Sequence, residues 1–217
     1  MHRPNAVFPD QSATPEGIES RALGTLAYIR ASIESSSSMD VPGMAGIVMG
    51  IIGVLTAIVV SLPRFAPHWL EIWLAAAMLA LVLGGALVAR QIVRGGHARY
   101  LGPARKFLLC LCPALLAGAV LTWVLWTTGT TGVIPGMWLL LYGCAVLSAS
   151  TVTTAGVVRL VGIMGALFVA LGSATFALPL IVHTSMLGVA HTAMLGLGFG
   201  VLHIVFGILI GRLTRDG

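Results

Sequence analysis

The chain has 217 residues, of which 58% are hydrophobic and only 9% are charged. A soluble domain usually carries about a quarter charged residues, so this composition excludes a protein whose whole surface faces water. The net charge of +5 comes from Arg and Lys residues clustered outside the long apolar segments, which favours roles in topology and lipid-headgroup contact over a nucleic-acid patch.

Three parts are expected before the first apolar segment. Residues 1–15 are rich in Pro, Asn, Gln and Ser and are predicted to be a disordered tail. From Glu16 to Glu34, apolar residues recur every three or four positions with charges between them. This pattern predicts an amphipathic cytoplasmic helix that lies on the membrane, docks on the bundle or binds a protein partner. Residues 35–42 begin with four serines and are expected to be a linker. We expect no signal peptide, because about forty mostly polar residues precede the first apolar run.

Six apolar segments follow, and each has about the length needed to cross a hydrocarbon core of roughly 30 Å. Separate apolar segments of this length must be helices when they lie in lipid. The sequence therefore predicts an all-α, polytopic integral membrane bundle over residues 43–211, with a cytoplasmic tail at 212–217. The expected spans are 43–62, 69–89, 107–127, 134–150, 157–178 and 188–211.

Basic residues predict how these spans are oriented. The connector between the second and third spans holds five of them, Arg90, Arg94, Arg99, Arg105 and Lys106. Cytoplasmic loops are enriched in Lys and Arg, so this connector is expected on the cytoplasmic side of a plasma membrane. Counting crossings from there places both termini in the cytoplasm.

The first and last predicted spans each carry a stripe of glycines at spacings of mostly three and four residues. Small residues let helix backbones approach closely in lipid, where burial of apolar surface does not drive association. Such stripes pack helices within a subunit or between subunits, so a homo-oligomer stays open. The predicted helix-packing residues are Gly43, Gly46, Gly50, Gly53, Gly196, Gly200, Gly207 and Gly211.

One histidine, His203, stands in the middle of the last span. An ionisable residue at bilayer depth is a functional hypothesis by default. It follows Gly200 by three residues and precedes Gly207 by four, so we expect it to face a neighbouring helix and form an interhelical hydrogen bond. Its candidate partners are Tyr142, Ser148 and Thr151 around the fourth span, and Ser173 and Thr175 in the fifth.

A haem or metal centre is a remote alternative. Haem held by two histidines needs imidazoles that face each other, whereas His191 and His203 share one helix and differ by about 120° of rotation. Cys110, Cys112 and Cys144 lack the spacing of metal ligands. We therefore expect no cofactor and no metal.

An intramembrane serine protease is a second remote alternative. Ser148 or Ser150 with His203 resembles the serine–histidine dyad across helices four and six of rhomboid proteases. Rhomboids carry this serine in a GxSG motif, and neither serine here has a flanking glycine. That departure argues against the protease.

A small proton, ion or small-molecule transporter using His203 and Tyr142 is the main alternative function. Transport sites are typically built where helices break near the midplane, and the prolines here lie near the ends of the spans. Because enzyme motifs are absent, we favour a non-catalytic sensor, adaptor or complex-stabilising subunit. The segment Glu16–Glu34 would then contact a protein partner.

The stretches LYGCAVLSAS and LGFGVLHIVFG resemble a group of six-helix bacterial inner-membrane proteins that have no established activity. In that group the last span is similar to LGFGxLHIxxG. The resemblance implies the same fold and a bacterial inner-membrane location. Residues 135–211 more distantly resemble short-repeat acid-resistance membrane proteins, in which glycine-containing spans pair as repeats. The positions to which the first resemblance points are Tyr142, Gly143, Ser148, Gly198, Gly200, His203 and Gly207.

Overall fold

The computed structural model describes residues 23–26, 28, 42–95 and 97–216 of the chain, and these contain helices and no strands. Short 3-10 turns precede several helices, at Ala66–His68, Thr131–Val133 and Thr184–Met186. The longer elements are α2 (Gly43–Ser61), α3 (Trp69–Gly95), α4 (His97–Thr127), α5 (Ile134–Ser150), α6 (Val158–Ile181), α7 (Leu187–Leu195), the π-helical segment η4 (Gly196–Leu202) and α8 (His203–Asp216).

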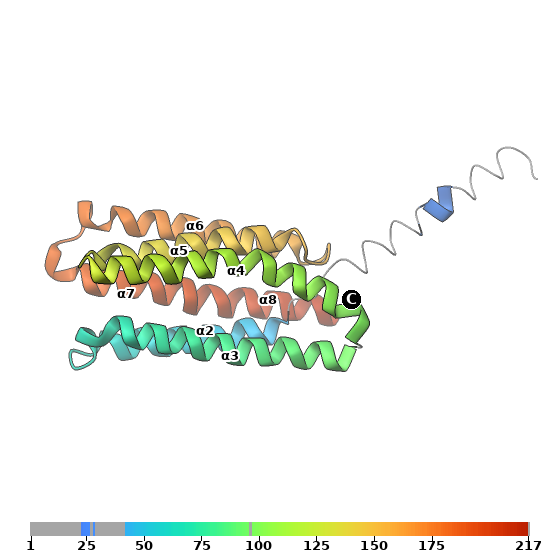
Figure 1. The fold of residues 1–217 in the computed structure, drawn as a ribbon, viewed down its shortest axis with the longest axis horizontal. Coiled ribbons are helices and arrows are strands. Elements are labelled where there is room, and N and C mark those ends of the chain that lie inside the picture. Colours follow the sequence, from blue (N-terminus) through green and yellow to red (C-terminus); the bar gives the residue numbers. More distant parts are fainter. Residues whose placement is uncertain (1–22, 27, 29–41, 96, 217) are drawn as a thin grey trace, which may run out of the picture. The chain divides into compact units, whose positions relative to one another are not determined.

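Within the described residues, six helical segments combine the length and the apolarity needed to cross a bilayer. The first five lie on α2 to α6, and α7, η4 and α8 follow one another along one rod to supply the sixth (Figure 1). For the part of the chain that the structure describes, the expectation of an all-helical fold with six apolar spans is confirmed, and it supports a multi-pass membrane protein.

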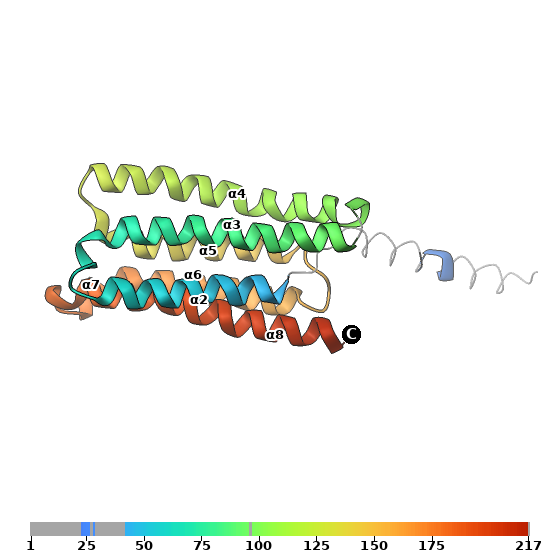
Figure 2. The same cartoon turned by 90° about the horizontal axis from the view of Figure 1, so that it is seen from below.

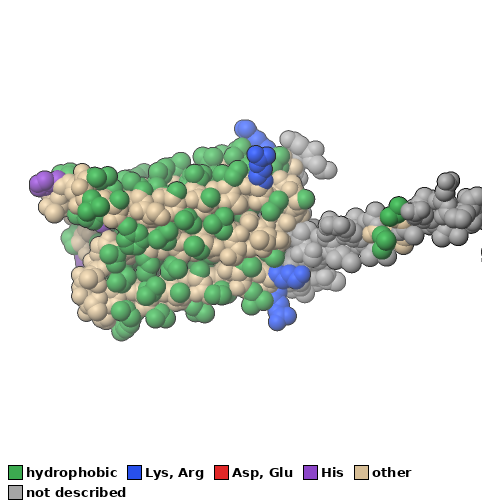
Figure 3. Space-filling view, turned by 90° about the horizontal axis from the view of Figure 1, so that it is seen from above, with side chains coloured by type: hydrophobic (Ala, Val, Ile, Leu, Met, Phe, Trp, Pro, Cys, Tyr) green, Lys and Arg blue, Asp and Glu red, His purple; other side chains and the backbone are tan. Residues whose placement is uncertain are grey.

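The helices of the second and third spans extend beyond the apolar segments. α3 continues to Gly95 and α4 begins at His97, so most of the basic connector is helical. Apolarity marks only the part of a helix that lies in lipid, whereas Arg, Leu, Gln and Ala in the connector favour helix beyond it. Figure 3 shows the Lys and Arg side chains of one face gathered at one end of the bundle, with histidine at the other.

Two tightly packed pairs make up the bundle. α2 lies against α8, and α5 lies against α6 (Figures 1 and 2). α3 adds to the first pair through α2, and α4 adds to the second through α5. α3 and α4 leave many large apolar side chains exposed, among them Met78 and Leu116, which suits contact with lipid tails.

Part of the predicted amphipathic helix is described. Residues 23–26 and 28 are helical, and Leu23, Leu26 and Tyr28 are exposed. The remainder of the Glu16–Glu34 segment, the tail at 1–15 and the linker up to residue 41 lie outside the described residues.

Candidate buried polar site

The glycine stripes of α2 and the last span face each other and bring two backbones into contact. A Cβ placed on Gly50 would lie 2.7 Å from the carbonyl oxygen of Gly200, and one on Gly53 would lie 2.8 Å from the amide nitrogen of Gly200. A Cβ on Gly46 would lie 3.2 Å from Cα of Gly207. Larger side chains would force the helices apart, and both stripes meet within one chain.

The two ends of this contact differ from each other. A Cβ on Gly196 would meet Cβ of Ala57 at 2.8 Å, so this position needs glycine. At the other end, a Cβ on Gly43 would lie 2.7 Å from the amide nitrogen of Gly211, whereas a Cβ on Gly211 would meet nothing within 4 Å. Gly211 therefore touches α2 through its backbone, and its missing side chain is not what permits the approach.

A second glycine contact joins α5 and α6, and sequence analysis did not identify it as an interface. A Cβ on Gly143 would lie 2.9 Å from the carbonyl oxygen of Gly165, and one on Gly172 would lie 3.0 Å from that of Gly136. Each helix holds its two glycines seven residues apart, which is two turns on one face. This shared spacing is the pattern that could have revealed the pair.

The last span departs from α-helical geometry over η4. A π-helix bonds residue i to residue i+5 and so has a wider turn, and such segments often occur at functional sites. Gly198 lies in this turn and is buried, and a Cβ there would meet the Phe168 ring at 3.1 Å. The same Cβ would lie 2.5 Å from Cδ2 of Leu139 in α5, so glycine lets the widened turn approach both α5 and α6.

His203 follows the π-helical segment and is hydrogen-bonded to Tyr142 of α5. The Tyr142 hydroxyl lies 2.7 Å from Nε2 of His203, and Nδ1 lies 3.4 Å from the carbonyl oxygen of Gly198. A carbonyl only accepts, so Nδ1 carries a proton in that contact. In the neutral imidazole Nε2 then accepts, and the tyrosine hydroxyl donates to it.

Aromatic rings surround this pair. The centroid of the Phe168 ring lies 4.9 Å from that of Tyr142 and 5.4 Å from that of His203. Phe199 adds a ring stacked on the imidazole at 6.2 Å. His203 is only 3% exposed, and Tyr142 is half-buried. A tyrosine–histidine pair relays protons only when water or substrate reaches it, whereas a covered pair joins two helices through a hydrogen bond.

His203 faces a neighbouring helix, as the spacing predicted, but on a different side from the glycine stripe. Gly200 and Gly207 face α2, but the ring of His203 turns toward α5 and α6, on the side where Phe206 and Ile210 are buried. His203 lies about 60° from Gly200 around an ideal helix, at the edge of the stripe. Its backbone stays near α2, with its carbonyl oxygen 3.2 Å from a Cβ placed on Gly46.

The structure does not bring the other candidate hydroxyls to His203. Ser148 is exposed and donates to the carbonyl of Cys144, and Thr151 is exposed and donates to that of Ser148. Ser173 and Thr175 also donate to carbonyls four residues earlier in their own helix. A serine or threonine in a helix can reach the backbone carbonyl three or four residues earlier, so these hydroxyls bond locally and not to His203.

A further interhelical hydrogen bond, between α5 and α4, was not anticipated. The indole Nε1 of Trp138 donates to Oγ1 of Thr122 at 2.8 Å, and that hydroxyl donates to the carbonyl of Gly118 at 2.6 Å. No sequence spacing links these two helices, so pattern analysis offers no route to this contact. Among the described residues, no group of three or more His, Cys, Asp or Glu side chains converges.

Comparison of the chain with protein-family models, with curated proteins and with solved structures finds no match in any of the three. The resemblance carried by LYGCAVLSAS and LGFGVLHIVFG therefore stays a prediction. The functional proposal is therefore argued from the geometry of the bundle.

Proposed function

We propose that the protein is a non-catalytic integral membrane module, an adaptor or a complex-stabilising subunit, whose N-terminal segment contacts a protein partner. The observation that carries this proposal is the enclosure of His203, which is 3% exposed and satisfied by Tyr142 and Gly198. A catalytic or transporting histidine must be reached by substrate or water. A structural one needs only its hydrogen-bond partners.

The proposed location is a bacterial inner membrane with both termini in the cytoplasm. Charge distribution supports this orientation, because Arg90, Arg159 and Arg212 stand near the end of α3, the start of α6 and the end of α8. Helices that alternate in direction bring these three to one end of the bundle (Figure 1). Arg64 follows α2 at the opposite end.

The partner role is tested on the full-length chain with one pair of variants. Leu26 belongs to the predicted apolar face of the N-terminal helix and is exposed, and Gly24 lies about 160° away around that helix. Leu26→Asp places a charge on the apolar face, and Gly24→Asp places the same charge on the opposite one. We expect Leu26→Asp to reduce recovery of a stoichiometric partner from detergent extracts about tenfold and Gly24→Asp to preserve it. Equal recovery with both variants, or no stoichiometric partner, would contradict the proposal.

A transporter is the second candidate, and the π-helical segment beside His203 favours it, because transport sites use interrupted helices. Proton flux into proteoliposomes that hold a pH-sensitive dye separates the two functions. For a non-catalytic module we expect the same flux from wild-type protein and from His203→Asn. A flux that this variant abolishes while the variant still folds and inserts into the vesicles would establish transport and overturn our proposal.

A further inference from the structure

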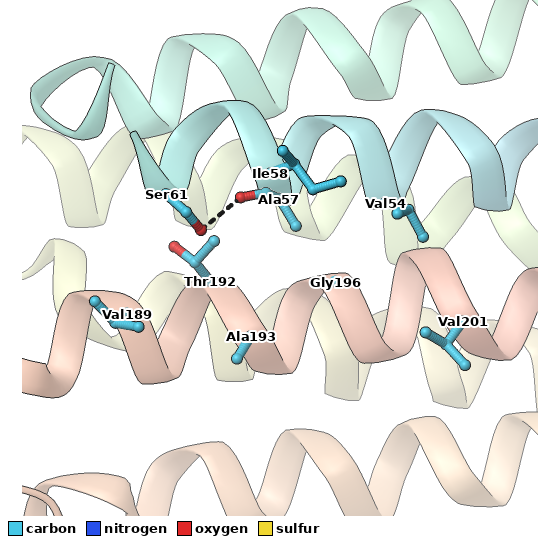
Figure 4. Close-up of a pocket in the computed structure, with 9 residues that line it drawn as sticks. All are labelled: Val54, Ala57, Ile58, Ser61, Val189, Thr192, Ala193, Gly196 and Val201. Carbon is cyan, nitrogen blue, oxygen red and sulfur yellow. Dashed lines mark hydrogen bonds between the residues drawn. The ribbon is translucent and has the colours of Figure 1, made fainter. Parts of the chain in front are cut away.

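A groove of about 280 Å³ lies between α2 and the last span (Figure 4). Neither Tyr142 nor His203 lines it. Its walls are mostly aliphatic, with Val54 and Ile58 on one side and Val189 and Val201 on the other. Ligand pockets hold roughly 300–1,000 Å³, so this groove suits a narrow guest such as a single hydrocarbon chain. The walls belong to two spans, so any occupant lies in the membrane.

One hydroxyl in this groove lacks a hydrogen bond. Thr192 is only 8% exposed, and its side chain points from α7 toward α2, beside Ser61 (Figure 4). Within the described residues its hydroxyl has no hydrogen-bond partner, and its oxygen is not among the fully buried polar atoms, so it opens onto the groove. The neighbouring hydroxyl of Ser61 donates to the carbonyl of Ala57 at 2.8 Å, so it is not a donor to Thr192. Buried hydroxyls are normally paired, so an occupant of the groove should bring an acceptor to Thr192.

The depth of the Thr192 hydroxyl in the bilayer indicates which chemical group could accept its hydrogen bond. α2 has 19 residues and is therefore about 28 Å long, close to the roughly 30 Å thickness of the hydrocarbon core. Ser61 is the last residue of α2, so a bilayer centred on α2 would place it and its neighbour Thr192 where the hydrocarbon meets the headgroup region. The ester carbonyls of phospholipids lie at this boundary. Arg64, three residues beyond Ser61, is exposed and complements the charge of a phosphate.

We infer that the groove is a specific site for one acyl chain of a diacyl phospholipid, with the ester carbonyl of that chain accepting a hydrogen bond from Thr192. The aliphatic walls flank the chain along an open groove, and the threonine fixes its depth. A bare hydrocarbon would leave the hydroxyl unpaired. This inference does not depend on the role of the N-terminal segment.

Photolabelling of the full-length protein tests where the chain binds. The protein is reconstituted into phosphatidylcholine vesicles doped with phosphatidylcholine that carries a diazirine in one acyl chain. We expect the label to concentrate on peptides that contain Val54 or Val201. Ala193→Phe should block the groove and remove this label, because Ala193 is an exposed lining residue. Ala77→Phe makes the same change on an exposed face of α3 and should leave the label unchanged.

The hydrogen bond is tested by combining a variant with a lipid analogue. Thr192→Val removes the hydroxyl at nearly constant shape, and an ether-linked phosphatidylcholine lacks the carbonyl. Unlabelled lipid is added to compete with the photolabel for the groove. The variant alone, or the ether lipid alone, should lower the apparent affinity of the competing lipid about threefold to tenfold. The two changes together should lower this affinity no further. Thr127→Val, at an exposed threonine bonded within its own helix, is the control.

Three outcomes would overturn the proposal. The first is a label spread evenly over all spans and indifferent to Ala193→Phe. The second is equal competition by ester and ether lipids against the wild-type protein. The third is a crosslink between two copies of the chain at the groove, which would make the occupant a second subunit. If Ala193→Phe fails to fold, the comparison of Thr192→Val with the two lipids decides alone.

Discussion

Replacing Tyr142 with phenylalanine removes one oxygen atom from the covered centre and leaves Nε2 of His203 without its donor. The ring contacts of position 142 with Phe168 at 4.9 Å and with Phe199 at 5.2 Å remain, so little packing is lost. A buried acceptor left unpaired costs about 1–3 kcal/mol, and interhelical hydrogen bonds measured in a bilayer contribute about 0.6–1.7 kcal/mol. Together these set the expected loss for Tyr142→Phe at about 1–2 kcal/mol in the free energy of unfolding.

Reversible unfolding in mixed detergent micelles measures this loss, and a double-mutant cycle with His203→Leu isolates the pair. Each single variant leaves one polar group unpaired, whereas the double variant removes both. The loss of unfolding free energy in the double variant should therefore be about 1 kcal/mol smaller than the sum of the losses in the two single variants. Thr151→Val removes a hydroxyl that is exposed and bonded within its own turn, so it should stay within about 0.5 kcal/mol of the wild type.

Additive effects in that cycle would refute the reasoning, because they would mean that Tyr142 and His203 do not stabilise each other. A loss for Tyr142→Phe no greater than that of Thr151→Val would refute it as well. It would indicate that water reaches Nε2, as a transport or sensing site requires.

The glycine contacts and the second interhelical hydrogen bond give three further predictions, all measured by unfolding in the same micelles. Gly50→Ala places a methyl group 2.7 Å from a carbonyl oxygen of η4 and should lower the free energy of unfolding by about 1–3 kcal/mol. A change near zero would show that α2 and the last span can move apart without loss of stability. Gly143→Ala meets the α6 backbone at 2.7 Å and should cost a similar amount, while Gly85→Ala meets nothing within 4 Å and should be neutral or stabilise by up to about 1 kcal/mol. Trp138→Phe leaves Thr122 without its donor and should cost about 1 kcal/mol, whereas no change would mean that lipid or water replaces the indole.

The lengths of the apolar segments alone were enough to locate the six long helical segments of the bundle. The predicted spans 43–62 and 134–150 agree closely with Gly43–Ser61 and Ile134–Ser150, because lipid requires every backbone group in a span to be paired within a helix. The ends of α3 and α4 could not be found in this way. Their basic extensions are helical because their residues have a high helix propensity, which an apolar window does not measure.

The arrangement around His203 was only partly predictable. Spacing placed the imidazole near a helix interface and left Tyr142 among five candidate partners. The choice depends on reach and competition: a tyrosine hydroxyl cannot turn back to its own backbone, whereas Ser148 and Thr151 bond locally. The π-helical turn of η4 could not be predicted from residue spacing. Spacing arguments assume a 100° rotation for every residue, and a π-helical turn does not have this rotation.

The partnership of α2 with α8 has a consequence for how the chain is made. About 150 residues separate Ser61 from Gly211, and a ribosome adds roughly 5–20 residues per second. The glycine face of α2 therefore waits roughly 8–30 s in the membrane before its permanent neighbour exists. During this interval lipid tails or a protein of the insertion machinery must cover that face, and α8 displaces them when it arrives.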